Sequence, residues 1–251
     1  VDRRIANGRP ALYRPKDESR DQSYFLFATT RSELDYIRFP LGALHKSEVR
    51  EVARVLDLPV AEKADSQDIC FVPQGRYSDL IERLRPDAIA PGNIVHVDGR
   101  VLGRHDGIVG FTVGQRRGLG VTGREPLYVV RLNADRAEVV VGPRDSLRVR
   151  TIMLKDVNWL GDERGTDGDN APERVRVRVR SSQEPQAALI SRSAGNATVA
   201  LGDGEFGVAS GQACVFYSSD SEARVLGGDR LSRTRPLGAR RDRTVGVALR
   251  R

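Results

Sequence analysis

The stretch NIVHVDGRVLG, residues 93–103, decides the fold class, because its apolar residues follow a period of two. Two short runs flank an Asp-Gly pair, which is typical of a tight hairpin turn. The stretch LYVVRLNADRAEVVVG, residues 127–142, predicts a second hairpin, and GIVGFTVG, residues 107–114, predicts one more strand. The sequence therefore predicts a small all-β unit that ends near residue 143.

A second group of short apolar runs extends from residue 151 to residue 228, with the spacing of a β-barrel or sandwich. One of these runs, ERVRVRVR, residues 173–180, predicts a strand with three valines on its buried face. Its other face carries a row of cations about 6.6 to 6.8 Å apart, namely Arg174, Arg176, Arg178 and Arg180. Such a row suits a phosphate backbone. The alternative is a solvated strand face in a chain that uses arginine at 37 of its 41 basic positions.

The residues before position 93 mix hairpin and helix patterns. Residues 1–14 predict a hairpin around an Asn-Gly pair, and residues 21–39, 45–59 and 76–84 predict helices. The helix over 45–59 has an apolar stripe at i, i+3, i+4 and i+7, formed by Val49, Val52, Ala53 and Leu56. The hairpin and the first two of these helices are too small for a core of their own. The predicted fold class is α/β followed by all-β.

The net charge of +7 on 251 residues belongs to the carboxy-terminal end. Eight of the 41 basic residues and one of the 34 acidic residues lie at or after Arg230, so the preceding residues carry no net charge. We expect residues 233–251 to be a basic, disordered tail. No apolar run approaches the roughly 20 residues that span a bilayer. The sequence predicts a soluble, cytoplasmic protein without a membrane partner.

The stretch GQRRGLG, residues 114–120, combines glycines with the guanidinium groups of Arg116 and Arg117. Accessible backbone N–H groups and guanidinium groups are suited to holding a phosphate or an RNA backbone. A glycine-rich connection with solvated arginines is the equal alternative. The stretch matches neither a Walker loop nor a dinucleotide fingerprint.

The chain contains two cysteines, Cys70 and Cys214. Cys70 lies in DSQDICF between Asp65 and Asp68, whose charges disfavour the reactive thiolate. Its spacing alone leaves open whether the thiol is buried packing or carries chemistry. Cys214 alternates with apolar residues in GQACVFY, which predicts a core position. The sequence predicts no metal ligand set.

Several long segments together carry a resemblance to a known family. The chain resembles the tRNA-specific 2-thiouridylases, bacterial enzymes that place sulfur on the wobble uridine, from about residue 1 to residue 228. The segments are RDQSYFLF, FPLGALHKSEVREVARVLDLPVAEKADSQDICFVP, PGNIVHVDGRVLGRHDGIVGFTVGQRRGLGV, PLYVVRLNADRAEVVVG and SGQACVFY.

The resemblance implies a chemistry for several residues. ATP, with magnesium, adenylates the uracil C2 oxygen, and a donor protein delivers sulfur as a persulfide carried on Cys70. The positions that match the family's tRNA contacts are Arg20, Asp21, Gln22, Arg180, Ser181 and Gln212. Arg20 replaces a lysine of the family, and Ser181 replaces an aromatic residue, which removes a stacking partner. Arg116, Arg117, Arg176 and Arg178 are further candidate phosphate or RNA contacts.

The resemblance also implies a domain order. Residues 1–78 are expected to be the end of an adenine-nucleotide-hydrolase-like (PP-loop) catalytic domain, 79–144 a central small β-domain and 145–232 a β-barrel. The family's ATP loop, its first catalytic cysteine and the disulfide partner of Cys70 have no counterpart here. We therefore expect the chain alone to be inactive and to bind ATP poorly. A rival hypothesis is a non-catalytic RNA-binding β-module in which Cys70 is merely buried.

Overall fold

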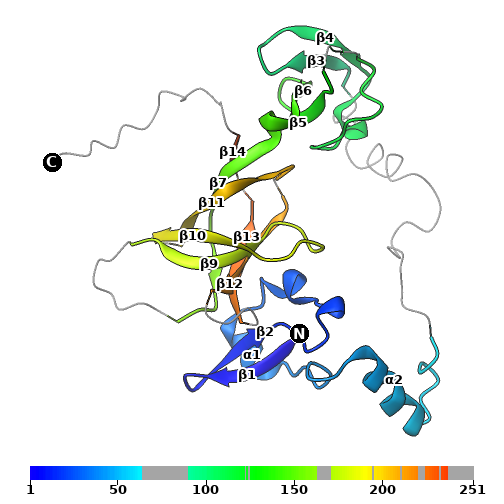
Figure 1. Ribbon diagram of the computed structural model, residues 1–251, viewed down its shortest axis with the longest axis vertical. Helices are drawn as coiled ribbons and strands as arrows, with labels where there is room; N and C mark the ends of the chain where they lie inside the picture. The colour runs from blue at the N-terminus through cyan, green and yellow to red at the C-terminus, as the bar shows by residue number, and fades with distance from the viewer. Residues whose placement is uncertain are drawn as a thin grey trace, which may run out of the picture.

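The computed structural model consists mostly of strands with a few short helices (Figure 1). It describes residues 1–63, 90–121, 123, 125–162, 171–193, 195–209, 211–219 and 224–231, and the backbone of 233–236. Within these residues no helix is long and apolar enough to cross a membrane.

The largest unit is an eight-stranded antiparallel sheet in the middle of the molecule (Figure 1). Its strand order is β14-β7-β11-β10-β9-β12-β13-β8. Because β7 and β8 belong to one stretch, 148–159, the two ends of the sheet are brought together and the sheet curls around one core. The strands are β7 (Arg148–Leu154), β8 (Asn158–Trp159), β9 (Glu173–Arg178), β10 (Gln186–Ser193), β11 (Asn196–Phe206), β12 (Ala213–Ser218), β13 (Val225–Arg230) and β14 (Arg233–Pro236).

Strand β12 is buried on both faces. Cys214 and Phe216 point into the barrel core, where they meet the valines of β9. Val215 and Tyr217 point to the other side and pack in a second core. An alternating strand with two apolar faces needs a covering layer on each side. The second cover comes from the amino-terminal end of the chain.

The amino-terminal segment supplies that cover. Leu12, Tyr24 and Leu34 pack against the outer face of β12 and β13 and share one core with them. The predicted hairpin is confirmed, with Asn7 and Gly8 at positive φ, 52° and 74°, as its tight turn requires. The elements of the amino-terminal segment are β1 (Asp2–Ala6), β2 (Arg9–Tyr13), the 3₁₀ helices η1 (Glu18–Arg20) and η2 (Ser23–Leu26), and α1 (Arg31–Tyr36).

Helix α2 (Lys46–Val55) forms within the predicted range but buries none of its residues. The side chain of Glu48 accepts a hydrogen bond from the backbone N–H of His45, which caps the amino end of the helix. Its expected apolar stripe remains largely uncovered within the described residues, with Val52 45% and Leu56 62% exposed.

The small β-domain has a four-stranded sheet in the order β4-β3-β6-β5. Both predicted hairpins are confirmed, and the parallel pair β3 and β6 joins them. The strand predicted over 107–114 is wrong: a 3₁₀ turn forms instead, because Ile108 and Phe111 pack against the core of the sheet and three glycines weaken the strand. The elements are β3 (Gly92–His96), β4 (Val101–His105), η4 (Ile108–Gly110), β5 (Tyr128–Asn133), β6 (Glu138–Gly142) and η5 (Arg144–Leu147).

Strand β14 pairs with β7, so the disorder predicted for the tail is wrong for residues 233–236. Residues 237–251 and the helix predicted over 76–84 lie outside the described residues.

Candidate nucleic-acid interface

The segment after β2 is fixed to the barrel by buried hydroxyl groups. The Tyr24 hydroxyl lies 3.1 Å from each of two acceptors, the carbonyl oxygens of Val179 and Ala213. The hydroxyls of Ser23 and Tyr217 share a buried hydrogen bond of 3.1 Å. Because buried polar groups are costly unless paired, these contacts hold the segment in one position on β9 and β12.

The carboxylate of Asp21 adds a buried ion triad to this attachment. One of its oxygens, Oδ2, accepts hydrogen bonds from Arg14 Nε at 2.9 Å and from Arg178 Nη1 at 2.7 Å. The other, Oδ1, accepts from the backbone N–H of Ser23 at 2.9 Å. The side chains of Arg14 and Arg178 are 4% exposed and that of Asp21 is 3% exposed. We call these three residues the Arg14–Asp21–Arg178 triad.

The triad keeps Asp21 ionised. Burial by itself raises the pKa of the Asp21 carboxyl, because a charged group is disfavoured away from water. The hydrogen bonds from Ser23 and Arg14 outweigh this effect and lower the pKa below its ordinary value. A buried carboxylate between two guanidinium groups is thus the stable state.

Neighbouring residues of the same segment point outward. Arg20 and Gln22 are exposed, although Asp21 between them is anchored. Phe25 is 59% exposed, and its ring meets the Tyr24 ring edge to face at 5.4 Å between centroids. An exposed phenylalanine beside a fixed tyrosine is a rigid apolar platform. The continuous helix predicted over 21–39 is wrong, because only a 3₁₀ turn over Ser23–Leu26 and the short helix α1 form there. For this reason Phe25 could not be identified from the sequence as a residue that faces outward.

The Tyr24 hydroxyl also brings two distant segments to the same place. Arg180 directly follows Val179, and Gln212 directly precedes Ala213, the two residues whose carbonyls Tyr24 contacts. Ser181 is exposed and Gln212 is half-buried. The side-chain oxygen of Gln212 accepts from the backbone N–H of Ala209 at 3.0 Å. The residues that flank this attachment form what we call the Tyr24 rim, namely Arg20, Gln22, Phe25, Arg180, Ser181 and Gln212.

The arginine row of β9 does not form the single exposed face that the sequence predicts. The valines are buried as predicted, but Arg178 is buried in the triad and Arg176 donates from Nη2 to the carbonyl of Pro185 at 2.7 Å. Arg180 forms an ion pair with Glu205. The prediction that the row faces outward is therefore wrong for Arg178. The reason is that the amino-terminal segment packs on this face and supplies Asp21 as a counter-ion.

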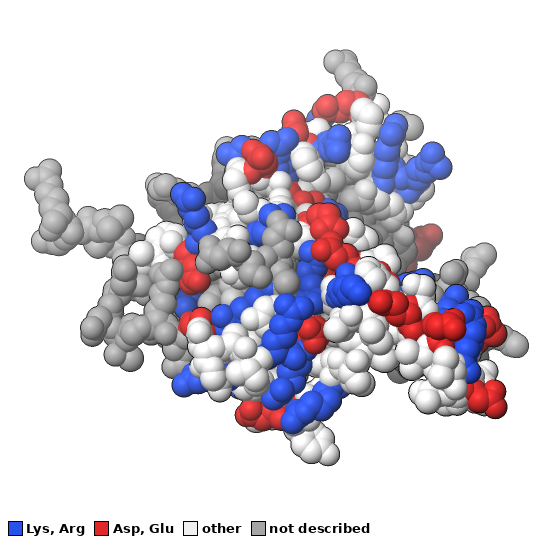
Figure 2. Space-filling view, turned by 60° about the horizontal axis from the view of Figure 1, so that its bottom comes forward, with Lys and Arg blue, Asp and Glu red and all other residues white. Residues whose placement is uncertain are grey.

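Charges of both signs lie close together on this end of the molecule. Figure 2 shows basic side chains in a band across the face, with acidic side chains beside them. Glu18 and Glu184 lie within 3.4 and 3.8 Å of Arg14, so exposed carboxylates border the triad. The surface thus does not present one uniform positive field, and individual side chains determine what it binds.

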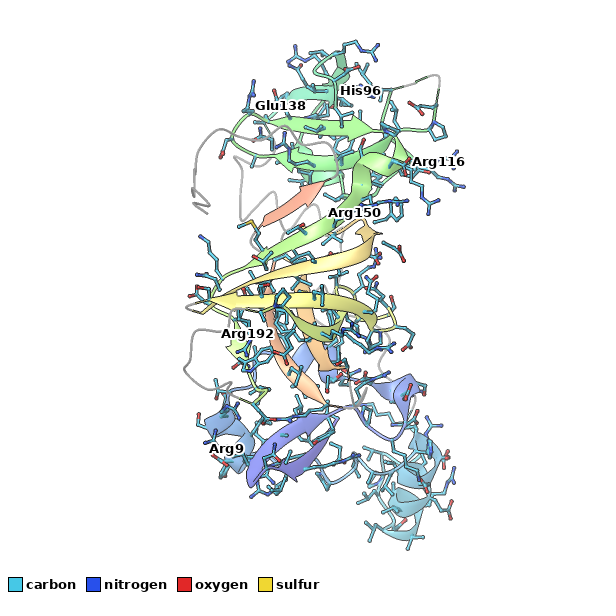
Figure 3. The ribbon with its side chains drawn as sticks, turned by 60° about the vertical axis from the view of Figure 1, so that its left-hand side comes forward. Arg9, His96, Arg116, Glu138, Arg150 and Arg192 are labelled. Carbon is cyan, nitrogen blue, oxygen red and sulfur yellow. The ribbon has the colours of Figure 1, made fainter. Side chains whose placement is uncertain are left out.

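The side chains of Arg116 and Arg117 take no part in the hydrogen bonds that hold the loop over residues 114–120. The Gln115 side chain holds the loop, because it accepts from the Thr112 N–H and donates to the Arg117 carbonyl, both at 2.9 Å. The side chains of Arg116 and Arg117 are exposed. Figure 3 shows Arg116 projecting from the edge of the small β-domain. A cavity of about 370 Å³ lies beside it, with Leu119, Glu125 and Leu127 in its lining.

The two cysteines belong to different segments of the chain. Cys70 lies outside the described residues. Cys214 is fully buried in the barrel core, which confirms its predicted position. Burial strongly raises the pKa of its thiol, so it is unreactive at neutral pH. Within the described part of the chain, no three His, Cys, Asp or Glu side chains form a group that could hold a metal ion.

Comparison with family models assigns the chain along most of its length. Residues 2–74 match a tRNA methyl transferase HUP domain, and residues 78–143 match a tRNA methyl transferase PRC-barrel domain. Residues 149–230 match an aminomethyltransferase beta-barrel domain. A HUP domain followed by two β-domains defines the class of protein, and it confirms the fold class predicted from sequence.

Curated relatives narrow this class to one family. The tRNA-specific 2-thiouridylases MnmA of Brucella ovis and Brucella canis are each 58% identical to the chain over 231 residues. The match covers 91% of this chain and 58% of each relative, so the chain spans less than two thirds of their length. The chain belongs to the tRNA-specific 2-thiouridylase family.

Proposed function

We propose that this chain binds tRNA through the Tyr24 rim and forms part of a tRNA-uridine 2-sulfurtransferase. The observation that carries the proposal is the position of the Tyr24 hydroxyl. This hydroxyl lies within hydrogen-bond distance of the carbonyl oxygens of Val179 and Ala213, which are 155 and 189 residues further along the chain than Tyr24. It therefore brings three distant segments of the chain together on one surface. Those segments hold the residues that match the family's tRNA contacts.

The chemistry of the Tyr24 rim suits an RNA backbone with unstacked bases. The guanidinium of Arg20 can pair with a phosphate, and the amides and hydroxyl of Gln22, Gln212 and Ser181 can bond to sugar and base edges. The exposed ring of Phe25 offers a surface for stacking, which the Ser181 side chain lacks. Arg116 and Arg117, which project from the small β-domain, are proposed as additional phosphate contacts. Arg178 is not, because it is buried.

The proposed reaction uses the Cys70 thiol. The Cys70 thiol takes the outer sulfur of the donor protein's persulfide, and the donor is left as a thiol. In a protein of the relatives' full length, this sulfur would replace the adenylated C2 oxygen of the wobble uridine, which leaves as AMP, while a second cysteine forms a disulfide with Cys70. The support for this role is the match of DSQDICF to the family motif, together with the assignment of residues 2–74 to the HUP domain. Cys214 cannot take this role because it is buried in the barrel core.

ATP and magnesium belong to the proposal only for a protein of the relatives' full length. The cavity beside Arg116 does not fit a nucleoside triphosphate. Arg116 is the one basic residue among the described residues of its lining, and the carboxylate of Glu125 would repel the phosphates. We therefore assign to the Tyr24 rim a role in binding and orienting tRNA, and no nucleotide to the cavity beside Arg116.

Replacing Arg20 by alanine tests the proposed surface. We expect weaker tRNA binding and a log-log salt slope smaller by about 0.7 to 0.9, the value for losing one phosphate contact. Arg9→Ala is the matched control, since Arg9 is an exposed arginine at the start of strand β2 and does not belong to the rim residues (Figure 3). Filter binding across a salt titration measures both quantities. Equal binding by Arg20→Ala and the parent would contradict the proposed surface.

A further inference from the structure

We propose that the Arg14–Asp21–Arg178 triad is a positioning device that fixes Arg20 and Gln22 for tRNA, and that Asp21 itself does not touch the RNA. The proposal rests on the proposed function, because it concerns the same surface. It assigns to Asp21 a different role from that of its two neighbours, although the three residues are consecutive in the sequence.

The acceptor capacity of the Asp21 carboxylate is directed into the protein. Oδ2 lies between Arg14 Nε and Arg178 Nη1, and Oδ1 accepts from the Ser23 N–H. The side chain is 3% exposed, so RNA cannot reach it without breaking these contacts. A carboxylate that met RNA directly would also lie near phosphates of its own charge. Both observations exclude a direct contact.

The same carboxylate shapes the backbone around Gln22. Its hydrogen bond to the N–H two residues further on is an Asx turn, which encloses Gln22 in a defined conformation. The backbone N–H of Asp21 bonds to the carbonyl of Glu18 at 3.2 Å and closes the preceding 3₁₀ turn that ends at Arg20. Asp21 therefore sets the direction of the residue on each side of it.

The two arginines attach this turn to two separate parts of the fold. Arg14 directly follows β2, whereas Arg178 is the last residue of β9, 157 residues away from Asp21. Any shift of the Asp21 carboxylate would break its hydrogen bond to one of the two guanidinium groups and leave a buried cation unpaired. The carboxylate is therefore confined to one position. The turn is thus held on the rim where Arg180 and Gln212 lie. Preorganised contacts of this kind raise affinity, since less ordering is needed on binding.

A double-mutant cycle tests whether Asp21 acts through its neighbours. Asp21→Asn keeps the size of the side chain but removes its charge. We expect about tenfold weaker tRNA binding in the otherwise unchanged chain, the loss of one well-placed contact. In an Arg20→Ala/Gln22→Ala background, Asp21→Asn should have no further effect, because the groups that it positions are gone. Thermal unfolding shows that each variant is folded at the assay temperature.

The outcomes separate this inference from the proposed surface. Equal losses from Asp21→Asn in both backgrounds would mean that Asp21 contributes independently, and would overturn the positioning role while leaving the surface intact. Parent-like binding by Asp21→Asn would also overturn it. Parent-like binding by Arg20→Ala/Gln22→Ala would overturn the surface and the inference together. If Asp21→Asn is unfolded, Arg178→Lys, which keeps a cation with a shorter reach, takes its place in the same cycle.

Discussion

Replacing Arg178 by alanine is expected to lower the free energy of unfolding by about 3 kcal/mol, the lower end of the range for breaking a buried ion pair. The lower end applies because Arg14 still pairs with Asp21 after the change. Arg178 is 4% exposed, so water cannot replace the lost guanidinium without opening the contact between the amino-terminal segment and β9. Urea unfolding followed by circular dichroism measures the difference.

The neighbouring Arg174 provides the control. It lies on the same strand and is exposed, so Arg174→Ala should change stability by no more than about 0.5 kcal/mol. The cost of Arg178→Ala should also shrink at acid pH. The folded-state pKa of Asp21 is lowered, so its contribution is present above the ordinary carboxyl pKa and is lost as the pH falls through the lowered value. Equal stability of the two variants at neutral pH would show that the triad does not hold the segments together.

Replacing Cys70 by serine is expected to abolish 2-thiouridine formation in a protein of the relatives' full length. A hydroxyl cannot carry a persulfide sulfur, so the loss should extend over several orders of magnitude, with tRNA binding unchanged. Nucleoside mass spectrometry of the tRNA measures the product. Cys214→Ser is the control. It should lower the free energy of unfolding by about 1 to 3 kcal/mol, because it places a hydroxyl in an apolar core, and it should leave sulfur transfer unchanged. Normal thiolation by Cys70→Ser would contradict the assignment of Cys70 as the sulfur carrier.

The local structure of this chain could be predicted wherever short-range geometry decides it. An Asn-Gly or Asp-Gly pair between alternating runs leaves little choice but a hairpin, and the structure has hairpins at Gly8 and Gly99. The alternation of β9 likewise placed Val175 and Val177 inside the barrel. The strand expected over 107–114 failed because its apolar residues cover a core rather than extend a sheet.

The environment of the arginine row could not be predicted, because it depends on a partner far away in the sequence. Alternation shows that Arg178 and Val177 point in opposite directions, but it does not show what lies on each side. Asp21 reaches Arg178 only because the amino-terminal segment packs on the barrel. The Tyr24 rim has the same origin, since nothing in the local sequence links Tyr24 to Val179 and Ala213. Only the family resemblance placed residues of these segments in one site.

Hydroxyl-radical footprinting of the chain with and without tRNA tests the central claim most directly. Two exposed aromatic residues serve as probe and reference: Phe25, 59% exposed on the Tyr24 rim, and Tyr36, 85% exposed at the end of α1. If tRNA binds across the rim, oxidation of Phe25 slows when tRNA is added and oxidation of Tyr36 does not. Unchanged oxidation of Phe25 at a tRNA concentration that saturates binding would place the RNA elsewhere and contradict the account.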